Sequence, residues 1–237
     1  MWGCLVTQWH RFELAKNVVV TVDPSQRRSF PPEEEQRIQE IWTRRKSSKL
    51  LFEASMICLV HHTPDLLIGQ LVNFSAWYAC TVDRALQEKL AFYPLGVTGR
   101  TIWKNRVLVG RRGPDVLSYS GAMECCPSGS LDPSFLAKDG KCDLVQAILS
   151  ELTEETGIAA AYVQSVTPVA LYQSTDDGVF DIQCDITLDP SADMSSLITP
   201  SKEYDQLLWM TKEEAKTIFA DRPWVPLSRH LLGESLL

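Results

Sequence analysis

The sequence predicts a mixed α/β fold. Segments rich in β-branched and aromatic residues recur along the 237 residues, and segments with the apolar spacing of amphipathic helices lie between them. Because the two kinds of segment alternate irregularly, they indicate a mixed α/β domain over residues 91–237. Residues 1–90 are expected to form a smaller N-terminal α+β subdomain that flanks it.

The first ninety residues contain three expected strands and two expected helices. The helix expected over 31–46 begins with two prolines and three glutamates and ends with two arginines and a lysine, an order that suits the helix dipole. A strand before it should end at the turn-forming sequence Asp-Pro-Ser. The expected strands span 13–23, 54–62 and 65–73, and the second, short helix spans 82–90.

The main domain should open with a hairpin over 98–113 that turns at Lys104-Asn105 and ends in paired arginines. A loop over 113–140 should follow, and then a helix over 143–156 that Asp143 caps at its N-terminus. The sequence T-K-E-E from residue 211 is a capping box. The remaining expected strands span 161–173, 179–188 and 205–210, and the last expected helix spans 212–219.

Composition limits the classes of partner. A formal charge of −7 argues against a nucleic-acid polymer, whose phosphates require a basic surface. No apolar run approaches the roughly 20 residues that span a bilayer, so no membrane partner is expected. Seven cysteines without metal-ligand spacing, and an N-terminus without a basic leader, favour a cytoplasmic protein with reduced thiols. The sequence leaves the oligomeric state open.

The helix over 143–156 carries an unusual concentration of acid at its C-terminal end. Glu151, Glu154 and Glu155 lie on one helical face because positions i, i+3 and i+4 are neighbours. Each acid is disfavoured there by about 0.3–1 kcal/mol, since the dipole is negative at this end. A hard divalent cation would remove the conflict, because Mg²⁺ prefers carboxylate oxygens. The alternative is a solvated acidic face, which is the commoner use of a charge cluster.

The acidic segment also resembles a known motif. E-L-T-E-E-T-G-I, residues 151–158, matches the second half of the Nudix box, R-E-U-x-E-E-x-G-U, in which U is a large aliphatic residue. The chain therefore resembles a Nudix hydrolase from about residue 90 to the C-terminus, and the resemblance implies a Nudix-type α/β/α sandwich with a mixed sheet. It departs from the full box at Ser150, where the family has arginine, and at Cys142, where it has an earlier glutamate. Gly129, in P-S-G-S-L-D, resembles the family's turn glycine, with about seven extra residues between it and the helix, and the resemblance makes it a candidate substrate-binding residue.

Within the family, the chain looks like the UDP-glucose and UDP-galactose pyrophosphatase branch. The segments that carry this narrower resemblance are R-I-Q-E-I-W-T-R-R, L-L-F-E-A, F-Y-P-L-G-V-T-G and L-V-Q-A-I-L-S-E-L-T-E-E-T-G-I. It implies a nucleoside diphosphate-linked small molecule as substrate, in particular a UDP-sugar hydrolysed to UMP and sugar 1-phosphate. Two alternatives remain: a Nudix-fold protein that binds a nucleotide with little or no turnover, and a pyrophosphatase for ADP-ribose or another dinucleotide.

The resemblance also implies roles for particular residues. Glu151, Glu154 and Glu155 would hold Mg²⁺, with Mn²⁺ as the alternative ion. Glu155 or Glu203 would accept the proton from water, and Glu203 precedes the strand that bears Trp209, where the family often has a further acid.

Three arginines are candidates for binding the diphosphate. Arg111 and Arg112 end a strand near the expected pocket, and an arginine can contact phosphate through two parallel hydrogen bonds. Arg100, beside a glycine, is a weaker candidate of the same kind. The alternative for all three is an ordinary exposed position at a strand end.

Overall fold

The computed structural model describes residues 9–45, 53–175 and 178–233. The strands are β1 (Trp9–Glu13), β2 (Val19–Arg27), β3 (Ser55–His62), β4 (Leu66–Asn73), β5 (Tyr93–Trp103), β6 (Arg106–Arg112), β7 (Met123–Cys125), β8 (Ser128–Ser130), β9 (Lys141–Cys142), β10 (Val163–Ser174), β11 (Phe180–Leu188) and β12 (Tyr204–Met210). The α-helices are α1 (Pro32–Arg45), α2 (Phe74–Val82), α3 (Arg84–Leu90), α4 (Leu144–Thr156), α5 (Lys212–Thr217) and α6 (Pro226–Gly233).

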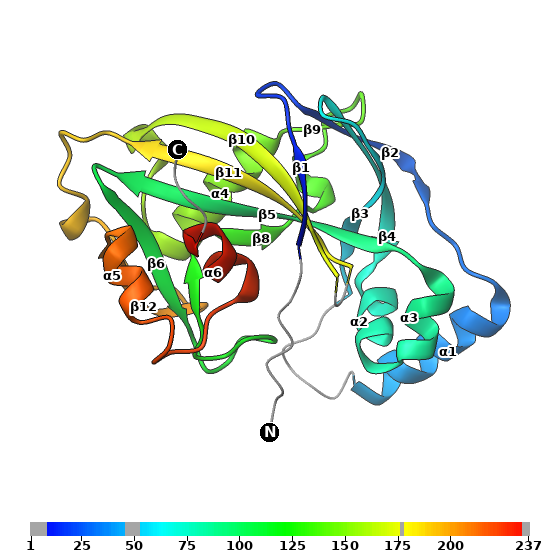
Figure 1. The fold of residues 1–237 in the computed structure, drawn as a ribbon. Coiled ribbons are helices and arrows are strands. Elements are labelled where there is room, and N and C mark those ends of the chain that lie inside the picture. Colours follow the sequence, from blue (N-terminus) through cyan, green and yellow to red (C-terminus); the bar gives the residue numbers. More distant parts are fainter. Residues whose placement is uncertain (1–8, 46–52, 176–177, 234–237) are drawn as a thin grey trace.

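The strands form one large mixed sheet, so the predicted mixed α/β fold is confirmed. Its main path runs β1-β10-β11-β5-β3-β4-β2-β9, and β6, β7, β8 and β12 branch from β5 and β6. The β11–β5 and β2–β4 pairs are parallel, whereas β10–β11 and β12–β6 are antiparallel. Figure 1 shows α5 and α6 beside β6 and β12, and α1, α2 and α3 gathered near the opposite end of the molecule.

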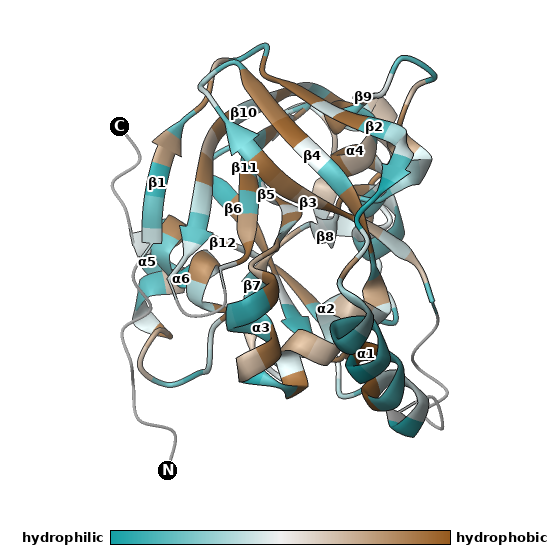
Figure 2. Cartoon of the chain, turned by 90° about the vertical axis from the view of Figure 1, so that its right-hand side faces the viewer, coloured by the Kyte–Doolittle hydropathy of each residue, from teal (hydrophilic) through white to brown (hydrophobic). Residues whose placement is uncertain are grey.

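Helices cover both faces of the sheet. Along β10, Leu171 belongs to the main apolar core, together with Ile148 and Leu152 of α4. Tyr172, the next residue, packs with Leu227 and Leu231 of α6. Because successive side chains of a strand point to opposite faces, α4 and α6 lie on opposite sides of this strand. Figure 2 shows hydrophobic colour along the central strands and a largely hydrophilic visible side on α1.

The two predicted parts of the chain share structure. β1 pairs with β10, and the main core combines residues of β2, β3 and β4 with those of β5, α4 and β11. A second apolar cluster is formed mainly by α1, α2 and α3 with β3 and β4. The boundary at residue 90 remains a prediction.

Several predicted elements are confirmed with altered limits. The hairpin turns at Lys104-Asn105, and Trp103 pairs with Arg106. The strand predicted over 13–23 is divided between β1 and β2, and β2 continues to Arg27 with a register shift after Val22. The predicted Asp-Pro-Ser turn lies inside that irregularity, where Asp23 accepts a hydrogen bond from the Ser25 amide at 2.9 Å.

Other elements were not expected from the sequence. The segment predicted as one helix over 82–90 is α3, and α2 precedes it directly. The predicted loop over 113–140 contains β7, β8 and a short 3-10 helix, Pro133–Phe135. No helix of the described residues has the length and apolar character needed to cross a membrane. Most of the N-terminal segment that was expected to lack a leader lies outside the described residues.

Candidate active site

The acidic helix α4 forms as its sequence predicts. Asp143 is the N-cap, and its side chain accepts a hydrogen bond from the Gln146 amide at 2.9 Å. Gly157 ends the helix in the left-handed conformation, with φ of 77°, which a residue without Cβ adopts at little cost. Ile148 and Leu152 are fully buried against the sheet. These contacts fix which side of the helix the acids occupy.

Two of the three predicted acids face inward toward the protein. Glu155 is only 3% exposed, and its Oε2 accepts a hydrogen bond from the Ser128 amide at 3.1 Å. Its other oxygen, Oε1, is buried without a hydrogen-bond partner among the described residues. Glu151 is partly buried one turn earlier. Glu154 is exposed and accepts a hydrogen bond from the Ser150 hydroxyl at 3.0 Å.

Gly129 leaves the space that the Glu151 carboxylate occupies. A Cβ built on Gly129 would lie 2.3 Å from Glu151 Oε1 and 2.4 Å from its carboxyl carbon. Real Cβ atoms do not approach other atoms so closely, so any side chain at this position would displace the carboxylate. The predicted role of Gly129 in substrate binding stays a prediction, and the structure shows a different feature of this glycine. It is a contact between the β8 backbone and the first acid of the motif.

The acids make each other costly to ionise. Burial, followed by the charges of Glu154, Glu203 and Asp132, raises the pKa of Glu151 to about 7. Burial, followed by the charge of Glu151, raises the pKa of Glu155 well above its ordinary value, although the Ser128 amide opposes this. Two carboxylates in a site of low polarity cannot both be charged without a compensating positive group.

The donor set suits a hard divalent cation. Carboxylate oxygens are the ligands that Mg²⁺ prefers, and the unpartnered Oε1 of Glu155 is a free buried acceptor. As the side chains are placed, the described residues contain no group of three or more acidic, histidine or cysteine side chains gathered closely enough to form a complete metal site.

Glu203, a predicted proton acceptor, acts electrostatically on the helix acids, and its catalytic role stays a prediction. It directly precedes β12, its side chain is exposed, and its charge contributes to the raised pKa of both Glu151 and Glu155. Asp132, which the sequence did not single out, also acts on Glu151. Its carboxylate caps the short helix after β8 by accepting from the Ser134 amide at 2.6 Å.

The predicted phosphate-binding arginines are all paired with acids of the chain. Arg100 makes two hydrogen bonds to Asp185, at 2.8 and 2.7 Å, and its side chain is 13% exposed. Arg111 makes two to Asp205, at 2.6 and 2.9 Å, on the surface.

Arg112 is also 13% exposed and donates to Glu124 at 2.5 Å. Burial opposes the charge of Arg112, but the Glu124 carboxylate raises its pKa overall. Of the three arginines, Arg111 has the most accessible side chain, and their predicted contacts with substrate remain predictions.

Glu124 is the main residue of this region that the sequence did not reveal. It is 4% exposed on β7 and lies close enough to Glu155 to raise its pKa. Its signal was weak: one acid in the short apolar run M-E-C-C, inside a segment predicted as a loop. The hydrogen bond from the Ser128 amide to Glu155 could not have been predicted, because it forms only where β8 approaches α4.

The two departures from the Nudix box have different structural uses. Cys142 lies in β9, pairs with Val20 of β2 and packs in the main core. Burial raises the pKa of the Cys142 thiol to about 11, so this residue cannot supply a charged ligand. Ser150 remains at the helix surface, where its hydroxyl contacts Glu154.

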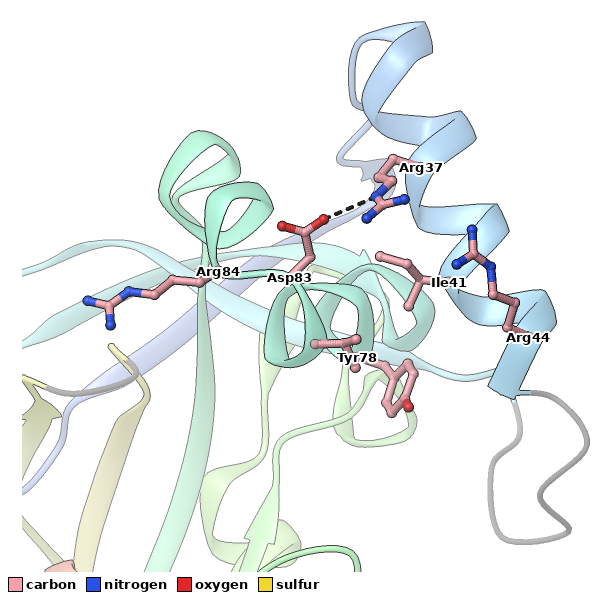
Figure 3. A pocket seen from close by; sticks show the side chains of 7 residues that line it. Arg37, Ile41, Arg44, Tyr78, Asp83 and Arg84 are labelled. Atoms are coloured by element: carbon pink, nitrogen blue, oxygen red, sulfur yellow. Dashed lines mark hydrogen bonds and ion pairs between the residues drawn. The ribbon is translucent and has the colours of Figure 1, made fainter. Parts of the chain in front are cut away.

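A hollow of about 400 Å³ lies elsewhere, between α1 and the α2–α3 pair. Its lining residues are Arg37, Ile41, Arg44, Tyr78, Val82, Asp83 and Arg84. Figure 3 shows Arg37 directed at Asp83, to which it is hydrogen-bonded at 3.0 Å. Arg44 and Arg84 are paired with glutamates of their own helices. The hollow shares no residue with the acidic site, and its arginines are already neutralised.

Comparison with known proteins gives similarity in structure only. No family model matches the sequence, and no curated protein matches it. Among solved structures, a MutT protein from Methanosarcina mazei is 20% identical over 59% of this chain and 89% of its own, with a TM-score of 0.41. The Nudix hydrolase RenU from M. smegmatis is 16% identical over 59% of this chain and 80% of its own, with a TM-score of 0.39.

A third similar structure is a bifunctional NMN adenylyltransferase/ADP-ribose pyrophosphatase from Francisella tularensis, complexed with AMP and a manganese ion. It is 20% identical over 63% of this chain and 42% of its own, with a TM-score of 0.44. At this level the similarities concern the arrangement of the chain, so a functional proposal depends on this protein's own residues.

Proposed function

We propose that this protein is a Nudix-type hydrolase that cleaves the phosphoanhydride bond of a nucleoside diphosphate linked to another group, with a divalent cation. The observation that carries the proposal is the pair Glu151 and Glu155 at the end of α4. Glu155 is almost fully buried, one of its oxygens has no partner among the described residues, and the pKa of each acid is raised. A solvated acidic face does not account for a buried carboxylate with an unused oxygen.

The helix acids would hold the cation, which is Mg²⁺ in the proposal, with Mn²⁺ as the alternative. Glu151 and Glu155 supply inward-facing oxygens, and Glu154 can join from the exposed side of the same turn. When bound, the cation neutralises charge on the diphosphate and lowers the pKa of a coordinated water. The Ser128 amide holds Glu155 through its Oε2, while Oε1 has no hydrogen-bond partner among the described residues.

In the reaction, the oxygen of water forms a bond to phosphorus, and the bridging P–O bond breaks. Glu203 or Glu155 accepts the proton from the water, because a general base must lie within hydrogen-bond reach of its proton. Glu203 is exposed, its charge acts on Glu151 and Glu155, and it is accessible for this role. Arg111, at the surface end of β6, is the arginine most accessible to a phosphate, provided that it releases Asp205.

The substrate class is proposed from the motif resemblance. A UDP-sugar, UDP-glucose or UDP-galactose, would give UMP and sugar 1-phosphate. The test is to incubate the purified chain with Mg²⁺ and UDP-glucose, and in parallel with ADP-ribose, NADH, a diadenosine polyphosphate and CoA, and to measure nucleoside monophosphate release.

Glu155→Gln should abolish turnover and leave the fold intact by circular dichroism. Glu88→Gln is the matched control, because Glu88 is a helical glutamate with a 71% exposed side chain on α3. Turnover that survives EDTA would contradict the cation-dependent mechanism. Tight nucleotide binding without turnover would instead favour the nucleotide-binding alternative, for which the Ser150–Glu154 contact is the supporting observation.

A further inference from the structure

Glu203 is an exposed acid whose position matters for the proposed reaction. It directly precedes β12, and its charge acts on Glu151 and Glu155 of α4. A group that takes part in proton transfer must be held within a fraction of an ångström of its productive position.

Tyr204, the residue after Glu203, is held in the protein interior. Tyr204 is fully buried, and its hydroxyl donates to Glu124 Oε2 at 2.7 Å. Arg112 Nη1 donates to the same oxygen at 2.5 Å. One carboxylate oxygen therefore joins β12, β7 and β6. Hydrogen bonds to an ionised acceptor in a buried site are stronger than neutral ones, so this junction is rigid.

The surrounding backbone shows that this junction is closely fitted. Gly110 lies beneath the Tyr204 ring, and a Cβ at Gly110 would lie 2.5 Å from Tyr204 Cδ1. The Gly113 amide donates to the Glu203 carbonyl at 2.7 Å. The β12–β6 register pairs Tyr204 with Arg112 and then shifts before Gln206. Glu203 and the residue after it are thus held by the last residue of β6 and by Gly113, which follows it.

We propose that Tyr204, Glu124 and Arg112 form a positioning cluster that fixes Glu203, the proposed proton acceptor, at the start of β12. Tyr204 is the positioning residue and touches neither substrate nor cation. This inference rests on the proposed function. It assigns the placement of Glu203 to a buried cluster that lies outside the acidic motif.

Tyr204→Phe is the direct test, because it removes one hydroxyl and keeps the ring that fills the core. Tyr172→Phe is the matched control: Tyr172 is also buried, its hydroxyl accepts a hydrogen bond from Arg11 at 3.1 Å, and it packs against α6. With UDP-glucose and Mg²⁺, Tyr204→Phe should lower kcat by about tenfold while KM changes little, as expected when a supporting hydrogen bond is lost. Tyr172→Phe should leave both constants unchanged.

A second measurement is independent of turnover. Mn²⁺ binding, followed by the electron paramagnetic resonance signal of free Mn²⁺, should weaken by a similar factor in Tyr204→Phe and Glu203→Gln and should not change in Tyr172→Phe. Glu124→Gln, which keeps the shape of the acid, should act in the same direction if Tyr204→Phe proves unstable.

The double variant decides between positioning and general stability. In a Glu203→Gln background, Tyr204→Phe should cause no further loss of kcat or of Mn²⁺ affinity, because residues that act as a unit are not additive. Additive losses, or a Tyr204→Phe protein equal to wild type, would overturn the assignment. A wild-type chain that neither binds Mn²⁺ nor hydrolyses any substrate overturns the proposed function itself, and the positioning role with it.

Discussion

Gly129→Ala tests the acidic site through a single methyl group. The added Cβ would lie 2.3 Å from Glu151 Oε1, whereas ordinary van der Waals contact begins at 3.4 Å, so the carboxylate must move by about 1 Å. The clash involves the far end of a flexible side chain, which can rotate away without moving the backbone. The substitution should therefore disturb the position of Glu151 and spare the fold.

The expected magnitudes differ sharply between stability and activity. Replacing glycine by alanine restricts the unfolded chain and stabilises a tolerant site by about 0.4–1 kcal/mol, so the free energy of unfolding should stay unchanged or rise by up to that amount. A displacement of about 1 Å in a catalytic group can lower activity by about a hundredfold. We expect kcat/KM for the best substrate to fall by about that factor, with a nearly unchanged thermal transition.

The assay compares Gly129→Ala with Gly233→Ala at saturating Mg²⁺, by nucleoside monophosphate release and by thermal unfolding. Gly233, at the end of α6, has no atom within 4 Å of a built Cβ and is the control for the loss of a glycine. If Gly129→Ala folds normally and retains wild-type kcat/KM, the position of Glu151 does not matter for the reaction and the proposed site is wrong.

Without a divalent cation, the chain should be less stable at pH 8 than at pH 5. The pKa of Glu151 in the folded state is raised to about 7. The protonated carboxyl therefore contributes to the free energy of unfolding in full below the ordinary pKa of a glutamate, and this contribution is lost as the pH rises through 7. After discounting for partial exposure, the loss of stability amounts to roughly 1–2 kcal/mol. Mg²⁺ should stabilise the chain more at pH 8 than at pH 5, and thermal unfolding measures both effects. Asp143→Ala should lower the free energy of unfolding by about 1 kcal/mol in urea, because the α4 cap is lost. Arg111→Ala should change the free energy of unfolding by less than about 1 kcal/mol, because the ion pair of Arg111 with Asp205 is exposed. An increased KM in this variant would show that Arg111 contacts the substrate.

The sequence predicted the elements whose signals are local. Helix α4 was predicted because its cap, its apolar face and its terminal glycine lie within fifteen consecutive positions. The hairpin at Lys104-Asn105 was predicted for the same reason. Helix α2 was missed because its sequence, F-S-A-W-Y-A-C-T-V, lacks polar spacing. Its N-cap residue, Asn73, makes no capping hydrogen bond to the helix, and its side chain accepts from Arg27 instead. The helix is buried against α1 and β4 and is stabilised by those contacts.

The ion pairs of the arginines could not be predicted, because they depend on how strands far apart in the sequence are aligned. Arg100 and Asp185 are joined because β5 and β11 run parallel in one particular alignment, and Arg111 meets Asp205 through the β6–β12 pairing. In the sequence each arginine appears as a free cation at the end of a strand. Only the fold shows that its charge has a partner.

The choice between a solvated acidic face and a cation site depends on Glu155. A solvated face requires water around each carboxylate, and Glu154 meets that condition because it is exposed. Glu155 does not, because it is 3% exposed and the charges that act on it belong to Glu151, Glu124 and Glu203. The nearby Arg112 already donates to Glu124. A buried acid among acids must either keep its proton or gain a cation, and the unpartnered Oε1 offers the cation a ligand.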